Sequence, residues 1–240
     1  MNVLLIPVKE VSKAKQRLTA HFSPVERIAL ADALWQDFFD VAAAARNVDK
    51  VFVVSAESRV LERARSFGWE VIPESQQISE SDSVDFASRW CVERGVDALL
   101  RLPVDLPLIQ PCDIESLFSG LPSRPATVIV PSRDGDGTNA LLRKPPTLFP
   151  SRFGPGSFAK HLAEASRCGA QIRVIRNPRL EVDIDDMEDL RVLSAHDVRA
   201  NATYAWLQAH GFVRATEEMA GGSEPLRAQV SSAARQSADP

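Results

Sequence analysis

The alternation of short apolar runs with amphipathic stretches is the feature that most restricts the fold of this chain. The apolar runs are rich in β-branched residues, as in strands buried on both faces of a sheet, and the longer stretches repeat their apolar residues at helical spacing. Such alternation is typical of a parallel sheet covered by helices. We therefore predict an α/β fold with a single doubly wound, mostly parallel sheet and helices on both faces.

The same pattern places the individual elements along the chain. Strands are predicted at Asn2–Val8, Lys50–Ser55, Trp69–Ile72, Asp97–Leu102, Ala126–Val130, Thr138–Arg143, Gln171–Ile175 and Glu181–Ile184. Helices are predicted at Pro24–Ala45, Glu57–Phe67, Ser79–Arg94, after Pro111, and at Ser157–Arg167, Asp186–Leu193 and Asn201–Ala209. Ser23-Pro24-Val25-Glu26 supplies an N-cap, a proline at the first helical position and the Glu of a capping box.

One domain is expected over residues 1–212, followed by a polar tail over residues 213–240. Beyond about Val213 the composition shifts to Ala, Ser, Gly, Glu and Gln. Such a segment has little apolar surface to bury, so the sequence predicts a disordered tail.

Charge and apolar content exclude several classes of protein. The chain carries 28 Lys and Arg against 32 Asp and Glu, a net charge of −4, which does not indicate a nucleic-acid binder. No stretch approaches the ~20 apolar residues of a membrane span. Met1–Val8 lacks a basic leader, and Cys91, Cys112 and Cys168 lie too far apart for a disulfide framework or a metal motif. These features favour a cytoplasmic location.

Ligands of open α/β sheets bind beyond the carboxyl ends of strands, which directs attention to the loop after the first strand. This loop carries the cations Lys9, Lys13, Lys15 and Arg17 against one acid, Glu10. Lys and Arg neutralise and hydrogen-bond polyphosphate, although a solvated basic loop would have the same composition. Glycine is absent between the first and last of these cations, so the loop is neither a Walker A motif nor a dinucleotide fingerprint.

Carboxylates follow a second buried strand. Asp105 lies between Pro103 and Pro107 at the end of Asp97–Leu102. A carboxylate there is a hard oxygen ligand suited to Mg²⁺ that carries substrate phosphates, and the alternative is a turn residue that caps backbone amides. Asp183-Ile184-Asp185-Asp186 could complete the metal site, or it could begin a helix, where acids complement the dipole.

A third candidate loop, Phe153-Gly154-Pro155-Gly156-Ser157, opens a predicted helix. Free N–H groups and a partial positive charge at a helix N-terminus favour anions, and glycine lets the backbone approach them closely. Ser157 could donate to a phosphate or carboxylate, or it could only cap the helix.

Other catalytic motifs are absent from the sequence. His21, His161, His196 and His210 have no partner at metal or triad spacing, and we expect them to be structural. No Gly-x-Ser-x-Gly elbow and no nucleophilic cysteine signature occurs.

Several of these motifs resemble those of small nucleotidyltransferases with a GT-A-like α/β fold. They are Pro7-Val8-Lys9, Lys15-x-Arg17-Leu18 and Pro103-x-Asp105-Leu106-Pro107. Three further motifs narrow the resemblance to the phospholactate guanylyltransferase family of coenzyme F-420 biosynthesis. These are Asp136-Gly137-Thr138-Asn139-Ala140-Leu141-Leu142, Phe153-Gly154-Pro155-Gly156-Ser157-Phe158 and Asp183-x-Asp185-x-x-x-Asp189-Leu190.

The resemblance implies a nucleotide-diphospho-sugar-transferase-like fold and Mg²⁺-dependent transfer of GMP from GTP to a phosphorylated acid, with release of diphosphate. Acceptors in the family are 2-phospho-L-lactate, phosphoenolpyruvate or 3-phospho-D-glycerate. The product would pass to a downstream transferase, and a homodimer is compatible with the sequence.

The resemblance also implies roles for individual residues. Thr138, Gly154 and Ser157 match the residues that hold the acceptor, and Asp105, Asp183 and Asp185 match the metal-binding aspartates. Pro7, Lys9, Lys15 and Arg17 match the loop that binds the nucleotide, and Lys15, Arg17 and Asp105 are expected to be catalytic.

One stretch departs from the family pattern. Many relatives carry Gly-Leu-Asn-Ala where this chain has Ser81-Asp82-Ser83-Val84-Asp85-Phe86-Ala87. That stretch lies near the nucleotide in the family, so Asp85 is expected to contact the nucleotide and to alter base, ribose or acceptor contacts.

Two other functions remain open from the sequence. One is a different nucleotidyltransferase, of the molybdopterin or sugar-phosphate type, although such enzymes typically begin with a glycine-rich loop. The other is a non-catalytic nucleotide-binding domain, which would not need to retain the acids at positions 105, 183 and 185.

Overall fold

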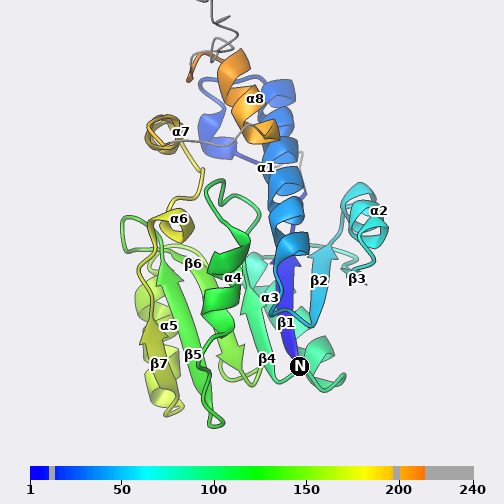
Figure 1. Ribbon diagram of the computed structural model, residues 1–240, viewed down its shortest axis with the longest axis vertical. Helices are drawn as coiled ribbons and strands as arrows, with labels where there is room; N and C mark the ends of the chain where they lie inside the picture. Colours follow the sequence, from blue (N-terminus) through cyan, green and yellow to red (C-terminus); the bar gives the residue numbers. More distant parts are fainter. Residues whose placement is uncertain (11–13, 197–200, 214–240) are drawn as a thin grey trace, which may run out of the picture.

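Seven strands form one sheet in the computed structural model, which describes residues 1–10, 14–196 and 201–213 (Figure 1). The strands lie in the order β3-β2-β1-β4-β6-β5-β7. Their bounds are β1 Asn2–Pro7, β2 Lys50–Ser55, β3 Glu70–Pro73, β4 Ala98–Arg101, β5 Ala126–Pro131, β6 Thr138–Lys144 and β7 Gln171–Val174. Only β6 runs antiparallel to its two neighbours among these strands. The predicted mostly parallel sheet is therefore confirmed.

Helices cover both faces of the sheet, as predicted. α1 (Pro24–Ala44), α2 (Ser58–Ser66) and α4 (Pro111–Phe118) pack on one face, and α3 (Glu80–Val92) and α5 (Ser157–Arg167) pack on the other. The shorter α6 (Pro178–Glu181), α7 (Met187–Ser194) and α8 (Ala202–Ala209) follow β7. Figure 1 shows α1 extending beyond the sheet, with α8 lying along its far end.

The core is divided between the two faces because successive residues of a strand point to opposite sides. Leu4 and Ile6 of β1 join the cluster under α1, α2 and α4. Val3 and Leu5 join the cluster under α3. All four side chains are fully buried, which explains the continuous apolar run that the sequence shows here.

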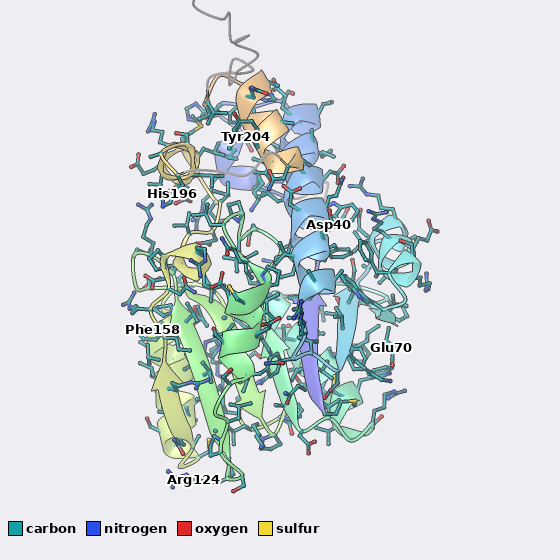
Figure 2. All side chains as sticks on the ribbon, in the orientation of Figure 1. Asp40, Glu70, Arg124, Phe158, His196 and Tyr204 are labelled. Atoms are coloured by element: carbon teal, nitrogen blue, oxygen red, sulfur yellow. The ribbon has the colours of Figure 1, made fainter. Side chains whose placement is uncertain are left out.

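A local signal starts α1 where the sequence predicts. Ser23 caps α1, its side chain accepting a hydrogen bond from the N–H of Glu26, whose carboxylate accepts from the N–H of Ser23. Asp37 of α1 accepts hydrogen bonds from the N–H groups of Ala202 and Thr203 and so holds the start of α8 against α1. Side chains fill the space between α1 and α8; Figure 2 labels Tyr204 of α8.

The predicted strand Glu181–Ile184 is wrong. Asn177 caps the short helix α6, which occupies Pro178–Glu181, and the residues after it have no regular structure. Val182 and Ile184 are buried as alternation suggested, but they pack in an apolar cluster with Leu190 rather than in the sheet. The N–H of Ile184 donates to the carbonyl of Asp105 over 3.1 Å, so this segment joins the loop after β4 by a single backbone contact.

The predicted tail and the predicted basic loop are only partly covered by the described residues. The predicted tail lies outside them from residue 214 onward, and so do residues 11–13 of the basic loop.

No helix within the described ranges is long and apolar enough to cross a membrane.

Candidate functional site

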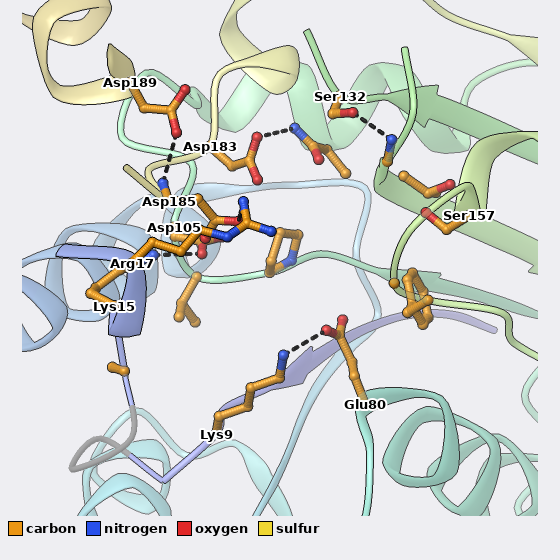
Figure 3. A pocket seen from close by; sticks show the side chains of 18 of the residues that line it. Lys9, Lys15, Arg17, Glu80, Asp105, Ser132, Ser157, Asp183, Asp185 and Asp189 are labelled. Carbon is orange, nitrogen blue, oxygen red and sulfur yellow. Dashed lines mark hydrogen bonds and ion pairs between the residues drawn. The ribbon is translucent and has the colours of Figure 1, made fainter. Parts of the chain in front are cut away.

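A cleft of about 630 Å³ opens at the carboxyl ends of β1 and β4. Loops after β1, β4 and β5, the segment before α5 and the segment after α6 form its wall. Figure 3 shows Lys15 and the aspartates at one side of this cleft and Ser157 at the other. Ten of the predicted site residues line it: Pro7, Lys9, Lys15, Arg17, Asp105, Thr138, Gly154, Ser157, Asp183 and Asp185. The rule that ligand loops gather at the carboxyl ends of strands thus holds for a cleft built from five separate segments of the sequence.

Lys15 is a buried cation of the basic loop. Its ammonium lies 2.7 Å from the carboxylate of Asp105 and also donates to the carbonyl of Ile184, and its side chain is 7% exposed. The backbone of Lys15 is left-handed, with φ 53°, just before a 3-10 helix at Gln16–Leu18. A non-glycine residue in this conformation is held by its surroundings, here by the two contacts of its ammonium.

Lys9 and Arg17 point their charges into the open part of the cleft. Arg17 lies 3.3 Å from Asp185 and is 70% exposed, and Lys9 lies 3.3 Å from Glu80 and is 62% exposed. Exposed ion pairs of this kind contribute little to stability. Both cations can therefore turn toward an anionic ligand at small cost.

The three predicted metal-binding aspartates share the end of the cleft that contains Lys15. Burial, followed by the negative charges of Asp105 and Asp185, raises the pKa of Asp183 to about 6. Burial and the charge of Asp105 also raise the pKa of Asp185. Burial opposes ionisation of Asp105 as well, but the ammonium of Lys15 holds the pKa of that carboxyl below its ordinary value. Burial thus opposes ionisation of all three carboxyls, and mutual repulsion adds to this effect for Asp183 and Asp185.

A divalent cation fits this donor set. Within residues 1–10, 14–196 and 201–213, no three or more His, Cys, Asp or Glu side chains converge into a complete metal site. Mg²⁺ needs no such protein cage, since it usually takes one or two carboxylates together with water and substrate phosphates. Asp105 and Asp183 are suited to supply them, and a cation would favour the ionised form of Asp183, whose pKa is raised first by burial and then by the charges of Asp105 and Asp185.

The opposite end of the cleft offers neutral hydrogen-bond donors. Gly154 adopts φ +111°, a backbone conformation that favours glycine, and in the described part of the chain its N–H has no hydrogen-bond acceptor. Ser157 is 1% exposed, and its hydroxyl takes part in none of the hydrogen bonds among the described residues. These two groups are free to receive an anion.

The start of α5 differs from the sequence expectation in two ways. Ser157 is the first helical residue, because Gly156 occupies the N-cap position with φ 68°. The N–H groups at the helix entrance are also largely used. Gly156 donates to the carboxylate of Asp136 over 2.8 Å, Ser157 to the carbonyl of Gly154, and Phe158 to the carbonyl of Asp136. Asp136 therefore takes the place that a bound anion was expected to fill, and Ser157 is not a cap.

Thr138 begins β6 at the wall between the two ends of the cleft. Its hydroxyl lies 3.0 Å from Nδ1 of the buried His161, and its carbonyl accepts from Arg101 over 3.3 Å. The preceding Gly137 is required by close packing, because a Cβ at this position would lie 2.8 Å from the hydroxyl oxygen of Ser132. Backbone and side chain of Thr138 are thus both fixed.

The relatives of this chain identify the kind of site. The sequence matches the family described as "Guanylyl transferase CofC like" over residues 1–229. The chain belongs to this family.

Named members of the CofC-like family match most of the chain. A phosphoenolpyruvate guanylyltransferase of Rubrobacter xylanophilus is 39% identical over 191 residues, which cover 80% of this chain and 92% of that protein. A 2-phospho-L-lactate guanylyltransferase of Methanothermobacter thermautotrophicus is 35% identical over 192 residues, covering 80% and 83%. This CofC-like protein is therefore an enzyme, a nucleotidyltransferase of the guanylyltransferase type.

Solved structures confirm the fold of the CofC-like chain. A Desulfovibrio desulfuricans structure described as a nucleotide-diphospho-sugar transferase superposes with a TM-score of 0.72. It is 17% identical and covers 88% of this chain and 96% of its own. The expected nucleotide-diphospho-sugar-transferase-like fold is thus confirmed.

The structure does not bring Asp85 to the cleft of this CofC-like protein. Asp85 pairs with the buried Arg143 at 3.0 Å and accepts hydrogen bonds from the N–H and hydroxyl of Ser151. The carboxylate therefore ties α3 to β6 and to the loop after β6. The expected contact with the nucleotide does not fit this placement, because the charge of Asp85 is already used to compensate Arg143.

Sequence reasoning missed Arg101, a cation buried in the wall of the cleft. Arg101 is 5% exposed, pairs with Glu80 and lies over the ring of Phe153 at 4.2 Å. Burial lowers the pKa of Arg101 to about 10, so it stays charged at neutral pH. An arginine inside an otherwise apolar strand run was the signal that could have indicated it.

Proposed function

We propose that this protein transfers GMP from GTP to the phosphate of a small phosphorylated carboxylic acid in the biosynthesis of coenzyme F-420. Phosphoenolpyruvate and 2-phospho-L-lactate, the substrates named for the two relatives above, are the first acceptors to test, followed by 3-phospho-D-glycerate. One observation carries the proposal. A single cleft combines a cluster of cations and carboxylates at one end with free neutral donors at the other.

The neutral donors suit the acceptor. A phosphorylated acid is a small anion that needs several hydrogen bonds in a restricted space, and hydrogen bonds to charged groups are stronger than neutral ones. Among the described residues, the N–H of Gly154 and the hydroxyl of Ser157 have no hydrogen-bond partner, and Thr138 lines the same cleft. An acceptor placed here lies across the cleft from the aspartates.

The charged end suits the triphosphate. Lys9 and Arg17 are largely exposed and can contact phosphate oxygens, whereas Lys15 is held at a constant position by Asp105. Positive charge here stabilises the diphosphate as it leaves. When Mg²⁺ is bound by Asp105 and Asp183, it supplies further positive charge that lets two anionic substrates approach each other.

The chemistry needs alignment and charge neutralisation rather than a base. An oxygen of the acceptor phosphate attacks the α-phosphorus of GTP and forms a new P–O bond. The bond between that phosphorus and the bridging oxygen of the β-phosphate breaks, and the electron pair leaves with diphosphate. The acceptor phosphate is already ionised at neutral pH, so no proton must be removed. This agrees with the absence of a catalytic histidine from the described lining of the cleft.

The test measures diphosphate release from GTP and Mg²⁺ with each of the three acceptors, together with the mass of the product. We expect release that depends on an acceptor and a product that contains both GMP and the acid. ATP and CTP serve as donor controls. Release with a sugar phosphate or molybdopterin alone would favour the other nucleotidyltransferase class. GTP binding without release under any condition would favour a non-catalytic domain.

A matched pair of variants separates the role of the cleft from a general effect of charge. Asp105→Asn removes a carboxylate charge at the site, whereas Asp40→Asn removes one from α1, where Asp40 is exposed away from the cleft (Figure 2). Only the first substitution should lower acceptor-dependent release. Equal activity of the two variants contradicts the assignment of Asp105.

A further inference from the structure

The buried His161 joins two parts of the acceptor end of the cleft. It lies on α5 and is fully buried. Its Nε2 is 2.8 Å from the backbone nitrogen of Arg152, and its Nδ1 is 3.0 Å from the hydroxyl of Thr138. Its ring also contacts Phe153 edge to face, with centroids 5.0 Å apart. One imidazole thus contacts both β6 and the segment that leads to Gly154.

These contacts determine which ring nitrogen carries the proton. The backbone N–H of Arg152 can only donate, so Nε2 of His161 must accept. In a neutral imidazole the hydrogen then lies on Nδ1, which must donate to the hydroxyl oxygen of Thr138. Burial, together with the charges of Arg143 and Arg101, lowers the pKa of His161 to about 3, so the ring is neutral at pH 7.

Because the hydroxyl oxygen of Thr138 accepts the hydrogen bond from Nδ1–H of His161, the hydroxyl hydrogen of Thr138 remains available to donate. The oxygen accepts from Nδ1, and in the described structure no other group accepts the hydroxyl hydrogen. The carbonyl of Thr138 is held by Arg101, so the residue cannot turn away as a whole. Thr138 lines the cleft, where an anionic ligand offers the missing acceptor.

We propose that His161 is a positioning residue that, through its Nδ1–H, sets the hydroxyl of Thr138 as a hydrogen-bond donor to the anionic acceptor substrate. This inference rests on the proposed function, which places the acceptor at Thr138, Gly154 and Ser157. His161 itself does not line the cleft and takes no part in the chemistry.

Two substitutions of His161 separate its two hydrogen bonds. Asn places an amide N–H near the position of Nδ1 and keeps the donor to Thr138, whereas Gln places an amide oxygen near Nε2 and keeps the acceptor for Arg152. We expect His161→Gln to raise the acceptor KM by about 10-fold, since the hydroxyl of Thr138 loses the donor that sets it and its own hydrogen bond to the charged acceptor is weakened. His161→Asn should raise it by less, and neither variant should change the GTP KM.

Thermal stability, measured on the same variants, shows whether the effect is only structural. Equal increases in the acceptor KM for Asn and Gln, following an equal loss of stability, would overturn the inference. Combining His161→Gln with Thr138→Val provides a second check. Because His161 acts through the hydroxyl, the two effects on the acceptor KM should not add. Additive effects contradict a role through Thr138.

A measurement without turnover distinguishes failure of this inference from failure of the proposed function. Nitrogen-15 NMR of the imidazole in the free enzyme at pH 7 should show a neutral ring protonated at Nδ1. A ring protonated at Nε2, or charged, overturns the inference even in an active enzyme. Absence of activity with all three acceptors, with the ring protonated at Nδ1, would instead count against the proposed function.

Discussion

Replacing Asp85 tests whether this carboxylate compensates the charge of Arg143, as the structure shows, or contacts the nucleotide, as the sequence predicted. The guanidinium of Arg143 is 2% exposed and donates to Asp85, to the hydroxyl of Ser88 at 2.7 Å and to the carbonyl of Phe149. Burial lowers the pKa of Arg143, but the carboxylate of Asp85 opposes this effect and favours the charged form. In Asp85→Ala this buried charge loses its partner, and the N–H of Ser151 loses its acceptor.

The size of the effect follows from these contacts. Removing one partner of a buried ion pair costs about 3–5 kcal/mol, and the 24% exposure of the Asp85 side chain places this case near the lower value. A loss of about 3 kcal/mol lowers the Tm of a domain of this size by roughly 6–12 °C. Asp85→Asn keeps an oxygen for Arg143 and removes only the charge, so we expect a loss of about 1–2 kcal/mol.

Urea unfolding followed by tryptophan fluorescence gives the free energy of unfolding, and initial rates give the KM for GTP. Asp82→Ala, an exposed acid in the first turn of the same helix, is the matched control and should cost under about 1 kcal/mol. If Asp85→Ala raises the GTP KM strongly and leaves the unfolding free energy unchanged, Asp85 binds the nucleotide and our reading of the ion pair is wrong.

Three further perturbations have defined outcomes. Asp105→Asn should lower acceptor-dependent turnover at least about 100-fold, because it removes charge from a hard-cation site while keeping the hydrogen bond to Lys15. A near-normal kcat of this variant, measured by diphosphate release, would refute the role of Asp105. Ser157→Ala should raise the acceptor KM about 10- to 150-fold with little change in Tm, because Gly156 is the N-cap; a lower Tm with an unchanged KM indicates a structural role. His161 has its folded pKa lowered to about 3, so the unfolded chain takes up its proton first as the pH falls below about 6.5. Stability should therefore fall from about pH 6.5 to 3 by up to about 1.4 kcal/mol per unit from this group, and acid unfolding of His161→Gln should lack that contribution.

Several elements of the fold could be predicted because their signals are local. The capping box of Ser23 and Glu26 starts α1, and the continuous apolar run of β1 is buried on both faces. The gathering of Lys15, Asp105 and Ser157 in one cleft was also predictable, since each follows or faces the carboxyl end of a strand. These inferences need only helical or strand periodicity and a general rule of α/β topology.

The segment at Glu181–Ile184 shows where such signals become ambiguous. Alternating buried residues indicate a strand, but Val182 and Ile184 are buried by a cluster of side chains instead of by a sheet. Periodicity indicates which side chains are buried, but it does not indicate which element covers them. Asn177 and Pro178, which start α6, were the local signal against the strand.

The sequence by itself determined the alternation of strands and helices, the ends of most helices and the set of charged residues that can meet at one edge of the sheet. Only the tertiary structure decided which partner each buried polar group takes. Asp85 and Arg143 lie 58 residues apart in the chain, and Thr138 and His161 lie 23 apart, so no local spacing relates them. A buried charge or ring nitrogen must find a hydrogen-bond partner wherever packing brings one within about 3 Å, and that choice depends on the whole fold.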